Sequence, residues 1–253
     1  MHRFHSGRRN WLADLPPVTD SASASAIADA GTCTSEIIRF YTNQSTDHQD
    51  RTLSDLLAST NSELERSHDY IQTLFPLPEP SPYNPLAPTI GPATAATFRS
   101  SLDLRLALRS SLRRMLSFYG FETAVDARGE LVIGRGRGWS SRSAFWRRRF
   151  DHNHLRITRI IRCLRVLGCE GDARRVYRAV SRSEGVGGRS LVFWRRASMR
   201  ELEVPPEDED GVGAVGRSDN GYDDDDDDEE EEEEEEEQEE QEGKGEGEEG
   251  MRW

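Results

Sequence analysis

Lysine, cysteine and long apolar runs are scarce in this sequence, and each scarcity excludes a class of protein. The single lysine, Lys244, lies in an acidic C-terminal region. The chain therefore lacks both the G-x-x-x-x-G-K-[ST] loop that holds nucleotide phosphates and a lysine elsewhere for a Schiff base. G-x-S-x-G and H-E-x-x-H are absent too, so we expect no enzyme and no cofactor, although counting alone leaves a Ser/His/Asp set open.

The three cysteines (Cys33, Cys163 and Cys169) are an odd number and form no C-x-x-C pair. No apolar stretch of secretory length follows the basic start, so we expect an intracellular protein with free thiols. No run approaches the roughly 20 apolar residues that cross a bilayer, so any membrane association would be peripheral. The spacing of His152 and His154 does not fit metal ligation, and we expect no metal site.

The formal charge of −14 combines two regions of opposite sign. Residues 201–253 hold 28 acidic and three basic residues, a net charge of −25, which leaves +11 for residues 1–200. Because Asp223–Asp228 runs directly into Glu229–Glu237, like charges repel and almost no apolar surface can be buried. We predict a disordered, acidic low-complexity tail over 201–253 and a single folded domain over 31–200.

Apolar periodicity predicts a mostly α-helical domain after a Ser/Ala-rich segment, residues 1–30, that we expect to be disordered. The pattern indicates helices over 34–43, 52–59, 62–75, 102–119, 140–150, 154–167 and 172–181, and a hairpin over 121–133. Expected helix caps are Thr34 or Ser35, Asn61 or Ser62, and Asn153. The apolar run 190–194 has no defined type.

Seven prolines between positions 76 and 92 predict an extended connector, because proline fixes φ and donates no backbone hydrogen bond. We interpret it as a loop that crosses the domain, with a ligand for SH3- or WW-type grooves as the alternative. The segment 134–138 (GRGRG) predicts a loop. A phosphate-binding loop or a minor-groove arginine contact is its alternative, on a weak motif.

Arginine supplies the positive charge, since residues 99–200 hold 24 arginines against eight acidic residues. A helical wheel of 154–167 places Arg159, Arg162 and Arg165 opposite the apolar stripe, so we expect them to face outward. A solvated helix face without a partner is one interpretation, and an electrostatic patch for nucleic acid or nuclear import is the other. The predicted patch consists of Arg147, Arg148, Arg149, Arg162 and Arg165.

The acidic tail has three interpretations. It is solvated disorder, a site for a basic protein such as a histone, or a segment that folds back on the chain's own arginines and gates them. Each exposed ion pair contributes only about 0–1 kcal/mol and is screened by salt. A fold-back contact would therefore depend on many pairs at once.

Four segments carry recognisable motifs: residues 65–77 (ERSHDYIQTLFPL), the pair Phe40–Tyr41, residues 115–120 (MLSFYG) and residues 152–161 (HNHLRITRII). In type and order they resemble the conserved domain of the opioid growth factor receptor family. The sequence departs from that pattern at Thr73, where the family usually has tryptophan. It also has the acidic tail where the vertebrate members carry C-terminal imperfect repeats.

The resemblance implies a mostly helical, non-catalytic domain of a receptor for an enkephalin-type peptide, acting at the nucleus or nuclear envelope in growth control. Packing alone does not account for several polar residues of these motifs, which either form a polar network or contact a ligand. These candidates are Glu65, His68, Tyr70, His154, Arg156 and Arg159. The alternative function is an arginine-rich helical module that binds nucleic acid or an acidic protein and is gated by the tail.

Overall fold

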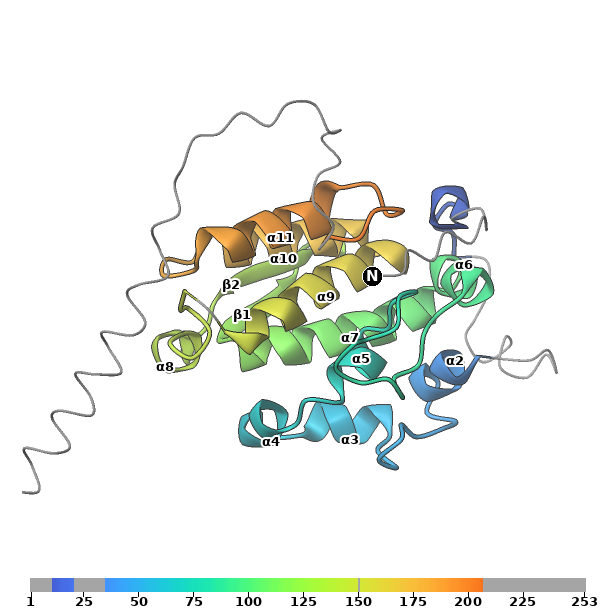
Figure 1. The fold of residues 1–253 in the computed structure, drawn as a ribbon, viewed down its shortest axis with the longest axis horizontal. Coiled ribbons are helices and arrows are strands. Elements are labelled where there is room, and N and C mark those ends of the chain that lie inside the picture. The colour runs from blue at the N-terminus through green and yellow to red at the C-terminus, as the bar shows by residue number, and fades with distance from the viewer. Residues whose placement is uncertain (1–10, 21–34, 150, 207–253) are drawn as a thin grey trace, which may run out of the picture. The chain divides into compact units, whose positions relative to one another are not determined.

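The computed structural model describes residues 11–20, 35–149 and 151–206, most of which lie in helices (Figure 1). This confirms the predicted mostly α-helical class. In chain order the elements are η1 (Trp11–Asp14), α2 (Glu36–Tyr41), α3 (Leu53–Ala58), α4 (Asn61–Arg66), α5 (Ile71–Leu74), α6 (Pro92–Ser100), α7 (Leu102–Phe118), β1 (Phe121–Val125), β2 (Leu131–Arg135), α8 (Trp139–Ser143), α9 (His152–Val166), α10 (Glu170–Ser181) and α11 (Gly188–Met199).

One continuous core holds the helices together. The two longest helices, α7 and α9, bury their apolar stripes, with Leu108 and Leu112 on α7 and Ile161 and Leu164 on α9 fully buried. Helices α10 and α11 pack on α9, whereas α2, α3 and α6 pack on α7 (Figure 1). Each buried side chain of this size contributes about 1.5–3 kcal/mol, so this core is the main stabilisation of the domain.

The segment 62–75, predicted as one helix, forms two helices in the structure, α4 and α5. The cap lies earlier than expected, at Thr60, which forms a capping box with Glu63. Helix α4 ends because Ser67 is extended, with φ −90° and ψ 133°. The residues between the two helices form a short link that carries part of the candidate site described below.

Helix α9 starts at a different cap from the one expected. Asp151 caps it, because its Oδ1 accepts a hydrogen bond from Asn153 N at 2.8 Å. The expected cap, Asn153, is instead buried in the first turn. The predicted end is confirmed, since Gly168 follows the helix with φ +87°, a left-handed conformation that favours glycine.

Several shorter elements differ from the sequence expectation. Helix α6 was not predicted, and it begins at Pro92, a residue favoured in the first turn. The run 190–194 lies within α11, and α8 covers only part of the expected helix 140–150. Gly134 and Arg135 belong to β2, so the GRGRG segment is only partly a loop.

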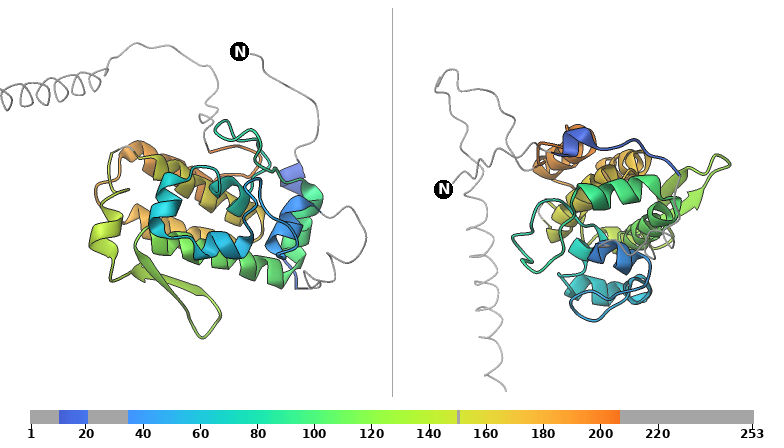
Figure 2. Two further views of the ribbon diagram at one scale, coloured as in Figure 1. Left: turned by 90° about the horizontal axis from the view of Figure 1, so that it is seen from below. Right: turned by 90° about the vertical axis from the view of Figure 1, so that its right-hand side faces the viewer.

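The predicted hairpin is confirmed. Strands β1 and β2 pair antiparallel, with Phe121 opposite Arg135 and Val125 opposite Leu131. Gly129 in the turn has φ +77°, which supports the expected position of the turn. Figure 2 shows the hairpin extending away from the helices, and Val125 is accordingly exposed.

The predicted disordered N-terminal segment and acidic tail lie largely outside the described residues, as does Cys33. Residues 11–20, however, pack on the helices. Leu12 is buried, Thr19 N donates to Arg99 O at 2.9 Å, and Arg99 Nε donates to Pro16 O at 2.5 Å. Hydrogen bonds to Arg99 therefore hold residues 11–20, a part of the segment 1–30, against the helical domain.

Candidate functional site

Arg156 on α9 joins the two longest motifs of the sequence. This residue is 6% exposed, and its guanidinium donates to the carbonyls of Leu64 (3.3 Å) and Ser67 (2.8 Å). It also donates to Asn153 Oδ1 at 3.1 Å and lies 3.0 Å from His68 Nδ1. The last backbone carbonyls of a helix have no hydrogen-bond partner within that helix. The Arg156 guanidinium donates to two carbonyls at the end of α4 and therefore stabilises this helix end.

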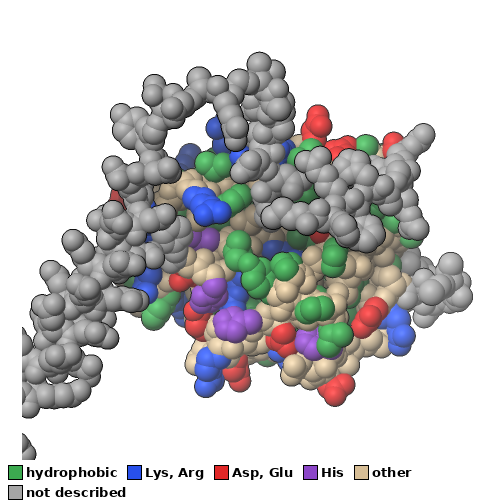
Figure 3. Space-filling view, in the orientation of Figure 1, with side chains coloured by type: hydrophobic (Ala, Val, Ile, Leu, Met, Phe, Trp, Pro, Cys, Tyr) green, Lys and Arg blue, Asp and Glu red, His purple; other side chains and the backbone are tan. Residues whose placement is uncertain are grey.

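Three exposed side chains border Arg156, and we call Glu65, His68 and His152 the surface trio. His152 Nε2 lies 3.3 Å from Glu65 Oε1, and these side chains are 44% and 40% exposed. The rings of His68 and His152 meet edge to face, with centroids 5.5 Å apart. Figure 3 shows histidine side chains beside acidic and basic ones on this face. The surface trio offers a ligand one carboxylate and two imidazoles on a rigid base.

Tyr70 is the buried member of this cluster. It is 0% exposed, and the Arg156 guanidinium lies 5.4 Å from the centroid of its ring, within the range of a cation–π contact. Burial raises the pKa of Tyr70 to about 12, while the charge of Arg156 acts in the opposite direction. The phenol is therefore neutral near pH 7, and Tyr70 acts as packing beneath Arg156.

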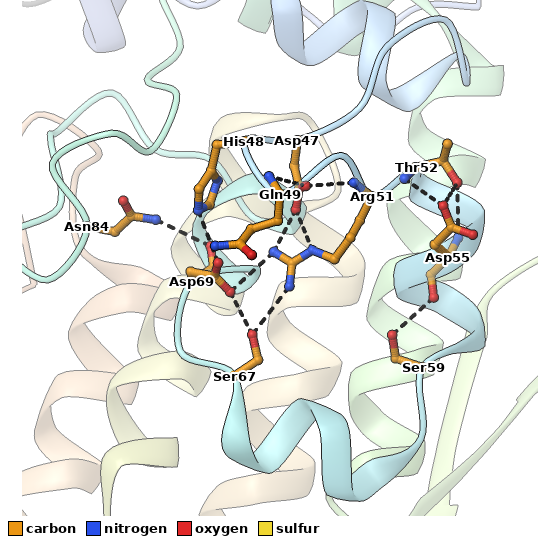
Figure 4. Close-up of polar contacts among 10 residues, drawn as sticks. All are labelled: Asp47, His48, Gln49, Arg51, Thr52, Asp55, Ser59, Ser67, Asp69 and Asn84. Atoms are coloured by element: carbon orange, nitrogen blue, oxygen red, sulfur yellow. Dashed lines mark hydrogen bonds and ion pairs between the residues drawn. The ribbon is translucent and has the colours of Figure 1, made fainter.

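Arg51 also holds the link between α4 and α5, through Ser67 and Asp69 (Figure 4). Arg51 Nη2 lies 2.6 Å from Asp47 Oδ2 and 3.2 Å from Asp69 Oδ1. Ser67 Oγ donates to Asp69 at 2.6 Å, and His48 Nε2 lies 3.0 Å from the other Asp69 oxygen. Two arginines, Arg51 and Arg156, therefore fix the link that carries His68.

The charge state of Asp69 follows from these contacts. Burial alone would raise the pKa of Asp69, but the Ser67 hydrogen bond and the charge of Arg51 together lower it below its ordinary value of 3.8. Asp69 is therefore ionised at neutral pH. Its carboxylate is held by Arg51 and Ser67.

His154, a predicted candidate, belongs to the core. It is 5% exposed, its Nε2 lies 2.7 Å from Trp146 O, and its Nδ1 lies 2.8 Å from Ser190 Oγ. Trp194 Nε1 donates to the His154 carbonyl at 3.1 Å. Because both ring nitrogens contact protein atoms, His154 fixes α11 against α9 and is not placed to meet a ligand.

A profile of the opioid growth factor receptor (OGFr) conserved region matches residues 33–182. The chain belongs to this family. The matched region contains the four motifs on which the resemblance rests, and it confirms that resemblance. It also contains Arg156, the surface trio and the arginines of the predicted electrostatic patch.

Individual relatives agree with the OGFr family assignment. The opioid growth factor receptor of Homo sapiens is 38% identical over 109 residues, which is 42% of this chain and 15% of that protein. The receptor of Rattus norvegicus is 38% identical over 107 residues, with shares of 42% and 18%. Opioid growth factor receptor-like protein 1 of Mus musculus is 32% identical over 113 residues, with shares of 42% and 22%.

The match spans less than a quarter of each relative's own length. No solved structure matches the chain. Within the ranges that the structure covers, no helix is both long and apolar enough to cross a bilayer.

The arginines on α9 of this OGFr domain do not form the predicted outward face. Arg162 is 3% exposed, pairs with Glu79, and donates to Leu202 O at 3.0 Å. Arg165 is half-buried and donates to Ala197 O at 3.0 Å. The helical wheel was right about the apolar stripe, but it carries no information about the segments that cover the opposite side of α9.

Several arginines share one structural role, which is to bind carbonyls at helix ends. Arg159 donates to Phe75 O at 3.2 Å, after α5, and Arg114 donates to Ser59 O at 2.6 Å, after α3. Arg165 binds two carbonyls at the end of α11 in the same way. A guanidinium has five donors in a planar fork, so one side chain can satisfy several orphan carbonyls.

The predicted electrostatic patch is split in the structure. Arg148 and Arg149 are exposed, and Arg147 is half-buried, with its Nε donating to Glu184 O at 2.8 Å. The Arg147 guanidinium also lies 5.7 Å from the centroid of the Trp139 ring. Arg162 and Arg165 are buried or half-buried elsewhere and do not contribute to this surface, which is therefore smaller than predicted.

Nucleophilic and metal chemistry find little support in the described residues. Cys163 and Cys169 are free and buried, and burial raises the pKa of Cys169 to about 12, so a reactive thiolate is disfavoured. In residues 11–20, 35–149 and 151–206, no group of three His, Cys, Asp or Glu side chains is arranged to hold a metal ion.

Sequence reasoning missed Arg51 and Asp69 as parts of this site. Arg51 contacts Ser67 and Asp69, which lie 16 and 18 residues further along the chain. Arg51 has no periodicity or local motif that marks it. Asp69 lies inside the first OGFr motif, and its place next to His68 is the only signal that could have indicated it.

Proposed function

We propose that this chain is a non-enzymatic, receptor-type protein that binds an enkephalin-type peptide. The match of residues 33–182 to the OGFr conserved region is the observation that carries this proposal. The relatives from Homo sapiens and Rattus norvegicus described above bear the name opioid growth factor receptor. The surface trio lies where two family motifs meet, and it supports the proposal by offering polar groups on a base held by buried side chains.

The six candidate residues have different roles in this proposal. Glu65 and His68, with the added His152, are the ligand-facing groups, because their side chains reach the surface. The other four, Tyr70, His154, Arg156 and Arg159, position the surrounding elements. A carboxylate at Glu65 suits a peptide ammonium group, and such a contact is worth more when the protein side chain is already held in place.

The test is titration of the full chain with a fluorescent enkephalin-type pentapeptide, followed by anisotropy. We expect saturable binding that an unlabelled copy of the peptide displaces. The binding should persist at a salt concentration of roughly 0.3 M, at which attraction between exposed charges is largely screened. Glu65→Gln should weaken binding, whereas Glu184→Gln, an exposed carboxylate elsewhere, should leave it unchanged. No saturable binding at any salt concentration would contradict the proposal.

We also propose that the protein acts at the nucleus or nuclear envelope. This location rests on the family resemblance and on the arginine-rich segment Arg142–Arg149, much of which is exposed in the structure. Fluorescence imaging of the tagged full chain tests it. Exclusion from the nucleus and from its envelope would contradict it.

A second candidate function is binding of nucleic acid or an acidic protein. Its supporting observation is the surface next to α8, where Arg148 and Arg149 are exposed and Trp139 lies beneath the guanidinium of Arg135 at 4.9 Å. A basic protein as a partner of the acidic tail, and gating by that tail, stay predictions from charge alone. Retention on a DNA column, measured with and without residues 218–253, tests this function and its gating.

A further inference from the structure

Two neighbouring aromatic residues after α8 point in opposite directions. Trp146 is 1% exposed, and its Nε1 donates to Tyr119 O at 3.0 Å. Phe145, the residue before it, is 60% exposed. The backbone between them is held further by Arg147 N, which donates to Ser143 O at 2.9 Å. Because Trp146 anchors this segment in the core, the Phe145 ring is presented to solvent from a fixed position.

Two glycines let the loop before α11 approach the end of this segment closely. A Cβ on Gly187 would lie 2.6 Å from Arg149 O, and a Cβ on Gly185 would lie 2.9 Å from Arg147 O. Both distances are too short for a side chain, so glycine is required where the two backbones meet. Residues 147–149 therefore lie beside the start of α11 (Figure 1).

Positive charge gathers where these two segments meet. Residues 145–149 and 182–189 contain five arginines and one acidic residue, a net charge of +4. A guanidinium binds phosphate through two donors at once and is only weakly hydrated, so this surface suits a polyanion. We call its exposed aromatic and basic members the α8–α11 surface: Phe145, Arg148, Arg149, Arg182 and Arg189.

The arginines of this region are already held by protein groups. Arg148 Nε donates to Ala144 O at 3.4 Å, and the Arg189 guanidinium lies 5.8 Å from the centroid of the Phe193 ring. Such contacts restrict the long side chains before a ligand arrives. Binding then costs less conformational entropy than it would for unrestrained arginines.

We propose that the α8–α11 surface binds single-stranded nucleic acid. A base would stack on the Phe145 ring, and the neighbouring phosphates would pair with Arg148, Arg149, Arg182 and Arg189. The inference rests on the second candidate function, binding of nucleic acid or an acidic protein, and names the kind of nucleic acid.

Phe145 is the residue that favours a single strand over other polyanions. The bases of a duplex stack on one another, so arginines can bind its phosphates but Phe145 meets no open base. A single strand exposes the flat faces of its bases, and these stack on aromatic side chains with little dependence on sequence. The carboxylates of an acidic protein would pair with the arginines but offer no flat ring to Phe145.

The test compares two fluorescent probes on the full chain by anisotropy. One is an oligothymidylate of about 12 nucleotides, within the usual site size, and the other is an abasic chain of equal length with the same phosphates. We expect the oligothymidylate to bind about five- to a hundredfold more tightly, the value of one stacked base. In Phe145→Ala that ratio should fall to near one, whereas Phe145→Tyr should keep it, because a phenol ring also stacks.

Tyr83→Ala is the matched control, because Tyr83 is another exposed aromatic residue, 77% exposed, on the proline-rich connector. It should leave the affinity ratio of the two probes unchanged. Arg148→Gln/Arg149→Gln should weaken both probes alike, since both carry the same phosphates, and should make binding less dependent on salt.

A ratio near one in the unmodified chain, or a ratio that survives Phe145→Ala, would overturn the inference. A duplex of equal length and polyglutamate separate this inference from the function on which it rests. Duplex or polyglutamate binding as tight as that of the oligothymidylate, and unaffected by Phe145→Ala, would overturn the single-strand site and leave the second candidate function standing. No binding of any of these polyanions at low salt would contradict both.

Discussion

The arginines of α9 and those next to α8 differ in what surrounds them, although the sequence presents both as basic clusters. On α9, Arg156 and Arg162 are 6% and 3% exposed, and their guanidiniums bind backbone carbonyls. Next to α8, Arg148 and Arg149 are exposed. A run of arginines in the sequence therefore does not by itself predict an exposed basic surface. The planar guanidinium, with its five N–H donors, also binds the backbone carbonyls that have no partner at helix ends.

The substitution that tests this difference between buried and exposed arginines most directly is Arg156→Ala. Leu64 O and Ser67 O would lose their charge-assisted donor, so we expect a loss of about 3 kcal/mol in the free energy of unfolding. For a domain of this size that corresponds to a melting temperature lower by about 6–12 °C. Arg156→Lys should also destabilise, since an ammonium group lacks the fork that reaches both carbonyls. Arg148→Ala is the exposed control, and equal effects of the two alanine variants would refute the distinction.

Arg159→Ala should have a smaller effect. Arg159 donates to Phe75 O at 3.2 Å and is only half-buried, so we expect a loss of about 1 kcal/mol and a melting temperature lower by about 2–4 °C. Thermal unfolding and peptide titration should be measured on the same preparation. An unchanged melting temperature together with weaker peptide binding would show that Arg159 faces a ligand and is not part of the structural network.

Acid titration tests the electrostatics of the link between α4 and α5. The folded-state pKa of Asp69 lies below its ordinary 3.8, so the ionised carboxylate stabilises the fold above that pH. That contribution is lost as the pH falls through the folded pKa. Denaturant unfolding between pH 5 and 2 should therefore show a shallower loss of stability in Asp69→Asn than in the unmodified chain. Asp14→Asn, an exposed control, should keep the original slope.

The smallest expected effect on stability belongs to the exposed pair. In Arg148→Gln/Arg149→Gln we expect a change within about 0.5 kcal/mol, because surface substitutions rarely exceed that value. Elution from a DNA column should nevertheless shift to lower salt, since phosphate contacts are strongly salt-dependent. Unchanged elution would remove this surface from consideration as a binding site for nucleic acid.

Much of the fold follows from patterns within single segments. The apolar stripes of α7, α9 and α10, the hairpin turn at Gly129 and the stop at Gly168 are local, and all were predicted. The break at Ser67 was not, because it depends on Arg156, which is 89 residues away. Helix α6 was missed because the prolines before it indicated a connector, although Pro92 is suited to a first helical turn.

The candidate site was predicted in part for the same reason. The motifs named Glu65, His68 and Arg156, and the structure brings these three together. Arg51 was not predicted, since its partners Ser67 and Asp69 come from a segment that it meets only after folding. His154 and Tyr70 were named as candidates but are buried, and a motif match does not distinguish a packed residue from an exposed one.

By itself, the sequence determined the helical class, the family and the separation of charge between the two parts of the chain. These depend on residue type and on periods of a few positions, which are local properties. Only the tertiary structure decided which arginines are buried and where the 62–75 segment breaks. Those features depend on which distant carbonyls and side chains become neighbours in the fold, and local sequence patterns do not specify these neighbours.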